Sequence, residues 1–301
     1  MLEESRVGSD QGWSRREFAR AVVGASSVAL GLGQVAGSEE PRADSILARF
    51  CRSMNPEQRR SLVFPFDDPK RTSVQNHWAI VPAPIASLTA AQQEMALGLV
   101  RQVCTPEGFA ALTRTRDDDA GGWKHDHIAV FGSPDEPGRF EWVLTGRHLT
   151  LRGSSTGVIS GGPLFFGHSA QESNLGDLQT ERVGSLFRSL DAQQQDRALV
   201  FDGQGEASSS GLTIDSLDLN QQVHARRLLA SLSEPFQAFE VPSVQACLQD
   251  QANGLRGFRW QRFRTDSCRD GDSPTVWRFV GPGFAWSFHG EPHVHSWFDS
   301  V

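Results

Sequence analysis

The sequence predicts an α+β fold of two tandem similar units, each of helices followed by an antiparallel sheet, packed as one globular body. Hydrophobic residues make up 38% of the chain, and 29 glycines among 301 residues bring the apolar share to about 48%, which is usual for globular proteins. Apolar residues at helical spacing precede apolar residues that alternate, an order typical of α+β proteins. Three blocks of sequence also recur, which predicts repeats at about 45–165 and 182–301.

Each recurring block pairs a stretch of the first unit with a stretch of the second. The shared features are a Gln followed by Leu-Val-Phe, a Ser-Leu followed by Gln-Gln, and aromatic strands with a glycine at the same place. The pairs are 58–64 with 195–201, 87–100 with 216–229, and 142–151 with 277–286. One such match is ordinary, but three in the same order indicate an internal repeat.

The helices of the first unit come before its strands. A short helix is expected to end in the strand-like residues 62–64. A longer amphipathic helix follows, and its apolar face is formed by Leu88, Met95, Leu99 and Val103. A further helix is expected to begin at Thr105, a favourable N-cap residue followed by Pro106 in the first turn.

The strands of the first unit follow these helices. Alternating apolar residues around Ile128 and Trp142 predict a hairpin, and a third strand is expected from Leu149. We expect residues 161–168 to form a loop that closes over a ligand. The second unit repeats the alternation at 258–260, 276–279 and 284–288.

The N-terminus is typical of an export signal. Arg15 and Arg16 precede Phe18 and a mildly apolar run over 21–33, which is too short to span a membrane. Paired arginines before such a run resemble a twin-arginine signal. We therefore expect a signal at 1–37, a globular region at 38–301, the twin-arginine machinery as a partner, and a periplasmic or secreted location. No stable membrane span is expected.

Composition excludes several classes of function. The net charge is −7, and acidic and basic residues are mixed along the chain, which argues against nucleic acid as a partner. Only Lys70 and Lys124 could form a Schiff base, and no phosphate-binding Gly-Lys-Ser/Thr motif is present. The four cysteines lack the Cys-x-x-Cys spacing of thiol redox or zinc sites. An oxidising compartment permits disulfides, and all three pairings of Cys51, Cys104, Cys247 and Cys268 remain open.

Histidines supply the best candidate site. His293 and His295 are two residues apart in a predicted strand, so both side chains lie on one face. With His148 they predict a metal site, which would suit zinc, copper or iron. His168 and Glu291 are weaker candidate ligands, and Glu291 could serve as a base. The alternative interpretation is a cluster of hydrogen-bonded polar side chains.

Three other patterns carry weaker signals. His125 and His127 are expected on the solvated face of a strand. Ser155 lies in a Gly-x-Ser-x-Gly motif, but no helix is predicted after it, as a nucleophile elbow would require. The acidic run 117–119 is expected to be a solvated loop, because it lacks the spacing of a calcium loop.

A family resemblance covers nearly all of the chain after the signal. The ordered blocks around Leu62-Val63-Phe64, Phe131-Gly132-Ser133-Pro134, Gly146-Arg147-His148-Leu149, Pro163-Leu164-Phe165-Phe166-Gly167 and His293-Val294-His295 resemble domain-of-unknown-function family 3500. Its members look like exported bacterial proteins without an established activity. The family pattern has Gly-His-His-Leu where this chain has Arg147, and it has a His-x-His near its end. The resemblance therefore favours His148, His293 and His295 over His125 and His127.

Two functions follow as expectations. The first is an exported protein that binds a transition metal through these histidines and acts as a metal-dependent enzyme, with its site at the junction of the two units. The second is a non-catalytic periplasmic or envelope protein that binds a small-molecule ligand through aromatic surfaces and loops.

Overall fold

The computed structural model describes most of the chain after the expected signal. The segment expected to be a signal, residues 1–37, lies outside the described residues. The described ranges are 45–75, 77–136, 138–168, 175–200, 210–249, 254–264, 273–291 and 293–300.

The described residues contain eight α-helices and eleven strands, which confirms an α+β fold. The helices are α2 (Ile46–Ser53), α3 (Pro56–Leu62), α4 (Ala90–Val103), α5 (Pro106–Ala120), α6 (Leu175–Ser189), α7 (Ala192–Ala198), α8 (Leu219–Ala230) and α9 (Pro242–Gln249). The strands of the first half are β1 (Val63–Phe64), β2 (His127–Gly132), β3 (Phe140–Gly146), β4 (Leu149–Ser154) and β5 (Leu164–His168). Those of the second half are β6 (Leu199–Val200), β7 (Leu212–Thr213), β8 (Arg259–Phe263), β9 (Val276–Gly281), β10 (Phe284–His289) and β11 (Val294–Ser300).

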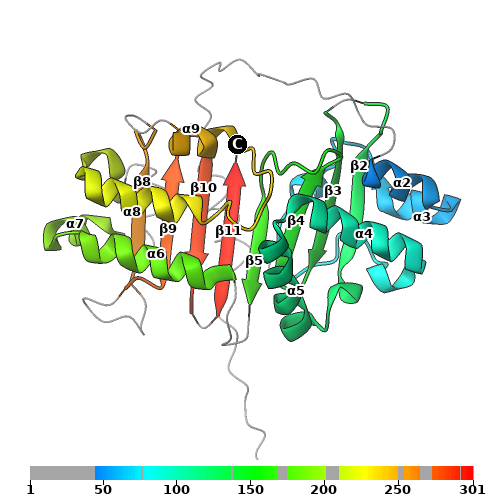
Figure 1. The fold of residues 1–301 in the computed structure, drawn as a ribbon, viewed down its shortest axis with the longest axis horizontal. Coiled ribbons are helices and arrows are strands. Elements are labelled where there is room, and N and C mark those ends of the chain that lie inside the picture. Colours follow the sequence, from blue (N-terminus) through cyan, green and yellow to red (C-terminus); the bar gives the residue numbers. More distant parts are fainter. Residues whose placement is uncertain are drawn as a thin grey trace, which may run out of the picture.

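All eleven strands belong to one mixed sheet (Figure 1). The order is β1-β2-β3-β4-β5-β11-β10-β9-β8-β6, with β7 paired to β8. The expectation of a separate antiparallel sheet in each unit is therefore wrong in two respects. The antiparallel pair β5–β11 joins the halves, and β1 and β6 run parallel to β2 and β8. The local alternation of apolar residues predicts which segments form strands, but it does not predict which strands are neighbours in the sheet.

Helices cover one face of the sheet, where α4, α5, α6 and α8 lie side by side in front of the strands in Figure 1. This face is apolar. Its largest side chains are fully buried and include Trp142, Trp260, Trp277 and Trp286. Most of the aromatic content is thus core, which follows from its alternation along the strands.

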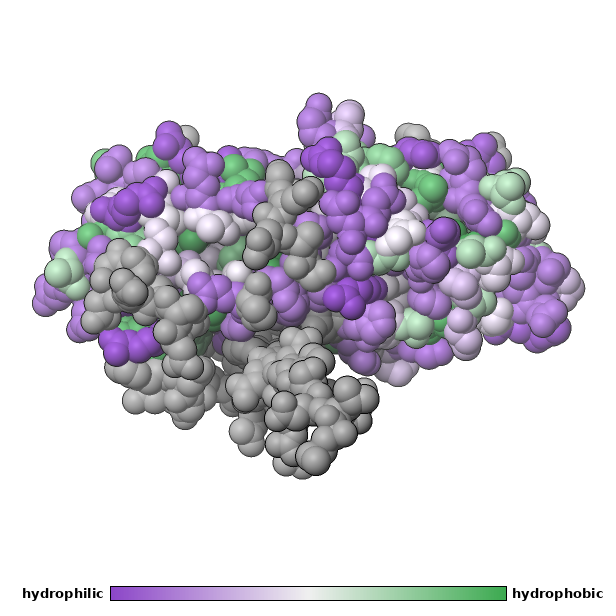
Figure 2. Space-filling model, turned by 90° about the horizontal axis from the view of Figure 1, so that it is seen from below, coloured by the Kyte–Doolittle hydropathy of each residue, from purple (hydrophilic) through white to green (hydrophobic). Residues whose placement is uncertain are grey.

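The described surface offers no extended apolar face from the side drawn in Figure 2, where hydrophilic residues predominate and the hydrophobic areas are small and separate. Leu219 and Val223 on α8 are the exposed large hydrophobic side chains within the described ranges. No helix in those ranges is long and apolar enough to cross a membrane.

Cys51 on α2 and Cys104 after α4 are buried and free. The side chains of Cys247 and Cys268 lie outside the described residues. Burial raises the pKa of the Cys51 thiol to about 11 and that of the Cys104 thiol to about 12. Because the thiolate is the reactive form, both groups are held in the unreactive state at neutral pH.

We therefore expect iodoacetamide to modify Cys51 and Cys104 only after unfolding. The measurement is peptide mapping of protein alkylated at pH 8 with and without denaturant. The denatured sample is the control for complete labelling. Native modification of either residue within minutes would contradict the burial described above.

Candidate metal centre

The centre is built on one row of residues that crosses β11 and β5 and ends at His148, in the turn just before β4. His295 on β11 pairs with Gly167 on β5, and the Gly167 amide donates to the His148 carbonyl at 2.9 Å. Strands two apart are about 9.5 Å apart, yet the ring centres of His148 and His295 are separated by 5.0 Å. Both imidazoles therefore lean toward each other over Gly167, which has no side chain to obstruct them.

His293 completes the group from the start of β11. Its ring centre lies 5.0 Å from that of His148 and 4.5 Å from that of His295. One nitrogen of each imidazole lies within 4.8 Å of one nitrogen of both others. His148 and His295 are buried and His293 is half-buried. The structure thus brings together the three histidines that the sequence singles out.

His148 is held in an unusual backbone conformation. It is the non-glycine residue with a positive φ, 53°, among the residues described, and such strain is concentrated at functional sites. Its Nδ1 lies 2.6 Å from a carboxylate oxygen of the buried Asp119, near the end of α5. Asp119 also pairs with Arg147 at 3.3 Å. Because the carboxylate occupies Nδ1, Nε2 is the nitrogen of His148 that is left to bind an ion.

A buried ion pair anchors the same turn. Arg116 on α5 donates from Nε to Asp126 at 3.0 Å, and its Nη1 donates to the carbonyl of Arg147. Gly146 permits this approach, because a Cβ there would lie 1.9 Å from a carboxylate oxygen of Asp126. The end of α5 therefore holds both the backbone and the ring of His148.

The electrostatics keep His295 neutral. Burial above all, together with the nearby His148, His293 and His289, lowers its pKa to about 3, while Asp119 acts in the opposite direction. A neutral imidazole is the form that binds metals. His295 Nε2 is buried and has no hydrogen-bond partner among the described residues, so its lone pair is available to an ion.

This low pKa predicts how stability depends on pH in the metal-free protein. Below about pH 6.5 the unfolded chain protonates His295, whereas the folded chain does so only near pH 3. The free energy of unfolding should therefore decrease as pH falls through this window, by about 1.4 kcal/mol per pH unit from this one group.

Urea unfolding between pH 5 and 6.5 in the presence of a chelator measures this slope. His295→Gln should make it shallower, because glutamine does not titrate. The matched control is His125→Gln, which changes an exposed histidine and should leave the slope unchanged. Equal slopes for wild type and His295→Gln would contradict the prediction.

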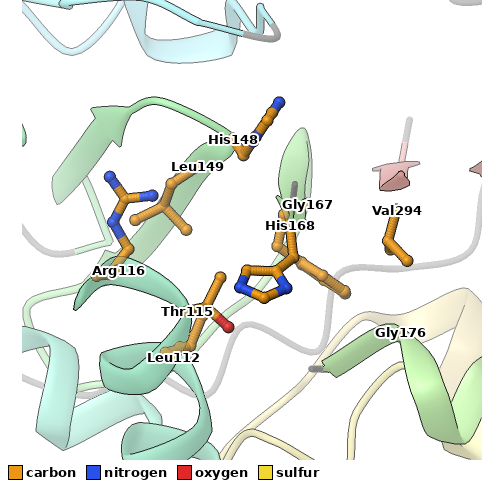
Figure 3. Close-up of a pocket in the computed structure, with 10 residues that line it drawn as sticks. Leu112, Thr115, Arg116, His148, Leu149, Gly167, His168, Gly176 and Val294 are labelled. Carbon is orange, nitrogen blue, oxygen red and sulfur yellow. The ribbon is translucent and has the colours of Figure 1, made fainter. Parts of the chain in front are cut away.

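The weaker candidates lie elsewhere. His168 is on β5, but its side chain points to the opposite, helix-covered face, away from His148 (Figure 3). There it lines a small pocket with residues that include Leu112 and Thr115 of α5 and also His148, and its Nε2 is 4.0 Å from Asp118. Glu291 is not part of the three-residue group either.

Three further expectations are corrected or refined. Residues 164–168 form strand β5 rather than a loop. The acidic run 117–119 forms the last turn of α5, and the Asp119 side chain is fully buried rather than solvated. Ser155 follows β4 in a turn with no helix after it, so no nucleophile elbow forms.

Sequence reasoning missed Asp119 and Gly167. Asp119 lies 29 positions before His148, and only the packing of α5 against the β3–β4 turn brings the two together. The available signal was a run of acidic residues at a helix C-terminus, where the helix dipole disfavours negative charge. Gly167 could have been suspected from its place between Phe166 and His168.

Comparison with known protein families gives a match. The sequence model of a protein family matches residues 38–230, which is more than half of the 301 residues. This range includes Asp119, His148 and Gly167 and ends before His293 and His295. No curated protein and no solved structure matches the chain. The chain therefore belongs to the family described as protein of unknown function (DUF3500), as its sequence blocks indicate.

Proposed function

We propose that the protein binds one transition-metal ion through His148, His293 and His295 and that it acts as a metal-dependent enzyme. The observation that carries this proposal is the convergence of three imidazole nitrogens within 4.8 Å of one another. Ligands of a tetrahedral zinc ion at 2.0–2.1 Å are about 3.3 Å apart. Binding an ion would draw the three nitrogens closer together than this bound.

The surroundings of the three histidines fit a cation. The contact between Asp119 and His148 Nδ1 matches the carboxylate–histidine–metal arrangement that fixes the ligand and raises its basicity. The C-terminal end of α5, with its partial negative charge, lies beside the group. Three histidines also leave a coordination position open, as in catalytic zinc sites. A metal bound there would supply Lewis acidity and an activated water.

Export is part of the same proposal. The paired Arg15 and Arg16 and the short apolar run after them support a twin-arginine signal at 1–37 and a periplasmic or secreted location. This route carries folded proteins, so a metal acquired before export would travel with the chain.

We also propose that the chain arose by duplication of units at about 45–165 and 182–301. One supporting observation is a repeated hydrogen-bond pattern between glutamines. The Gln92 amide donates to the Ser53 carbonyl and to Gln58, and the Gln221 amide donates in the same way to the Ser189 carbonyl and to Gln194. The sheet order, which reverses about the β5–β11 pair, is a second. In this pattern Gln194 is the equivalent of Gln58. The sequence blocks instead align Gln58 with Gln195, one residue later.

Metal content tests the proposed function. Protein purified without a histidine tag should bind one equivalent of zinc, copper or iron, and His148→Ala with His293→Ala should abolish the binding. Asp119→Asn should weaken it by about 10- to 100-fold, because the loss of an outer-shell carboxylate has that effect. His125→Ala is the control, since that residue is exposed and outside the group.

Two results would overturn the metal proposal. One is a wild type that stays empty after incubation with each of the three ions. The other is binding that survives the double substitution. The first result would favour the non-catalytic ligand-binding protein, with the histidines as ordinary polar residues.

A further inference from the structure

Phe165 on β5 packs against two of the three histidines. It lies two residues before Gly167, so its side chain is on the same face of the sheet as the imidazoles that meet over Gly167. Its ring centre is 6.4 Å from that of His148 and 5.6 Å from that of His295, and both arrangements are edge-to-face. Aromatic rings at such separations attract each other in this geometry. Phe165 therefore contacts one histidine on each side of Gly167.

The burial of Phe165 does not come from the main core. Phe165 is fully buried, yet it lies outside the contiguous hydrophobic core to which its neighbours Leu164 and Phe166 belong. Its ring stacks on Trp297 of β11 instead, with ring centres 5.1 Å apart. Trp297 is half-buried and its ring centre lies 5.2 Å from that of His295. A large apolar side chain is thus buried against the histidine group rather than in the core.

The two imidazoles beside Phe165 are held in different ways. Asp119 contacts the His148 ring at Nδ1. His295 Nε2 has no hydrogen-bond partner among the described residues, and its ring packs on Phe165 and Trp297. Binding sites need ligands whose rotamers are locked by the side chains packed around them. Without the ring of Phe165, both imidazoles would gain room to turn away from each other.

Resting on the proposed metal site, we propose that Phe165 is a positioning residue, which holds His148 and His295 in the orientation that binds the ion. Phe165 is not a ligand, because its side chain has no lone pair to donate. It fills the space on one side of both imidazoles and so keeps them turned toward each other before the ion arrives. Such pre-organisation raises affinity, because less side-chain freedom is lost on binding.

Cobalt(II) binding tests this role, because the visible absorption of cobalt(II) reports the geometry of its ligands. Phe165→Ala should weaken cobalt(II) binding by about 10- to 100-fold, the range for loss of a residue that orients a metal ligand, and should change the absorption spectrum. Phe165→Leu should lose less, roughly three- to tenfold, because it keeps an apolar side chain beside both rings. If Phe165→Ala does not fold, Phe165→Leu decides the question.

Phe279→Ala and Phe279→Leu are the matched controls. Phe279 on β9 is as deeply buried as Phe165, but its ring contacts Phe258 and Phe284 rather than a histidine. Both variants should lower the midpoint of urea unfolding, because they leave a cavity in the core. Where circular dichroism shows them to be folded, they should bind cobalt(II) with the affinity and the spectrum of the wild type.

The outcomes separate this proposal from the metal proposal. Failure of the wild type to bind cobalt(II), or binding unaffected by His148→Ala, would reject the metal centre itself. Folded Phe165 variants with the affinity and spectrum of the wild type would reject the positioning role alone. Equal losses of affinity in Phe165→Leu and Phe279→Leu would also reject it, because they would show a general effect of a weakened interior.

Discussion

Gly167→Ala is expected to disrupt the metal centre and to lower metal affinity by roughly 10- to 100-fold, the range for loss of ligand positioning. A Cβ at this position would lie 2.4 Å from the carbonyl oxygen of Val294 and 3.0 Å from the His295 ring. It would also lie 3.4 Å from the Cβ of His148. The backbone oxygen cannot move without separating β5 from β11, and the two imidazoles are forced apart.

The same clash should destabilise the fold. Overpacking of a buried site costs about 1–3 kcal/mol, so the midpoint of urea unfolding should decrease in the metal-free protein. Zinc affinity measured by competition with a chelator dye, together with urea unfolding, checks both effects. Circular dichroism at the measuring temperature shows whether the variant is folded when its affinity is determined.

Gly98→Ala is the matched control. Gly98 lies inside α4, and a Cβ there would meet only the Ile46 side chain at ordinary contact distances of 3.6–3.7 Å. Alanine in a helix interior is favoured over glycine by about 0.5–1 kcal/mol, so this variant should be as stable as wild type or more so, with normal metal affinity. If Gly167→Ala behaves like Gly98→Ala, the row across β5 does not form as described.

The sequence predicted the histidine ligands of this candidate centre better than it predicted the residues that position them. His293 and His295 were predicted to share a face because strand geometry has a period of two, and they meet in the structure. His148 was favoured by the family pattern. All three histidines can be predicted from the sequence because the pattern that indicates each of them is local or lies in a short motif.

The residues that position the ligands are brought into place by long-range packing, which the local periodicity of the sequence does not predict. Residues 164–168 were interpreted as a loop because two glycines and Pro163 precede them, yet Leu164, Phe165 and Phe166 are enough for a central strand once β4 and β11 flank them. Pairing of β5 with β11 joins segments more than a hundred residues apart. The burial of Asp119 likewise requires α5 to end beside the β3–β4 turn.

Arg116→Met is expected to have the largest effect on stability. Arg116 and Asp126 are both almost fully buried, and removal of one member of such a pair costs about 3–5 kcal/mol because the other is left as an uncompensated charge. The variant also loses the hydrogen bond to the Arg147 carbonyl. The turn that carries His148 should therefore relax, and metal affinity should decrease together with stability.

The pH dependence of this loss identifies its cause. Burial raises the pKa of Asp126 to about 6 even though Arg116 lowers it, so without Arg116 the folded-state pKa must rise further. In the variant, the pKa of the Asp126 carboxyl in the folded state is therefore even further above its value in the unfolded state. The free energy of unfolding of the variant falls as pH rises above about 4, and it continues to fall to a higher pH than in the wild type. The difference between wild type and Arg116→Met should accordingly be greater at pH 8 than at pH 5.

Two variants complete the experiment. Arg116→Met with Asp126→Asn should recover part of the lost stability, because asparagine carries no charge to be buried. Arg101→Met makes the same substitution in the exposed ion pair with Glu94 on α4, where about 0–1 kcal/mol is expected. Urea unfolding of all four proteins at both pH values gives the comparison. Equal losses for Arg116→Met and Arg101→Met would show that the pair beneath His148 does not anchor the turn.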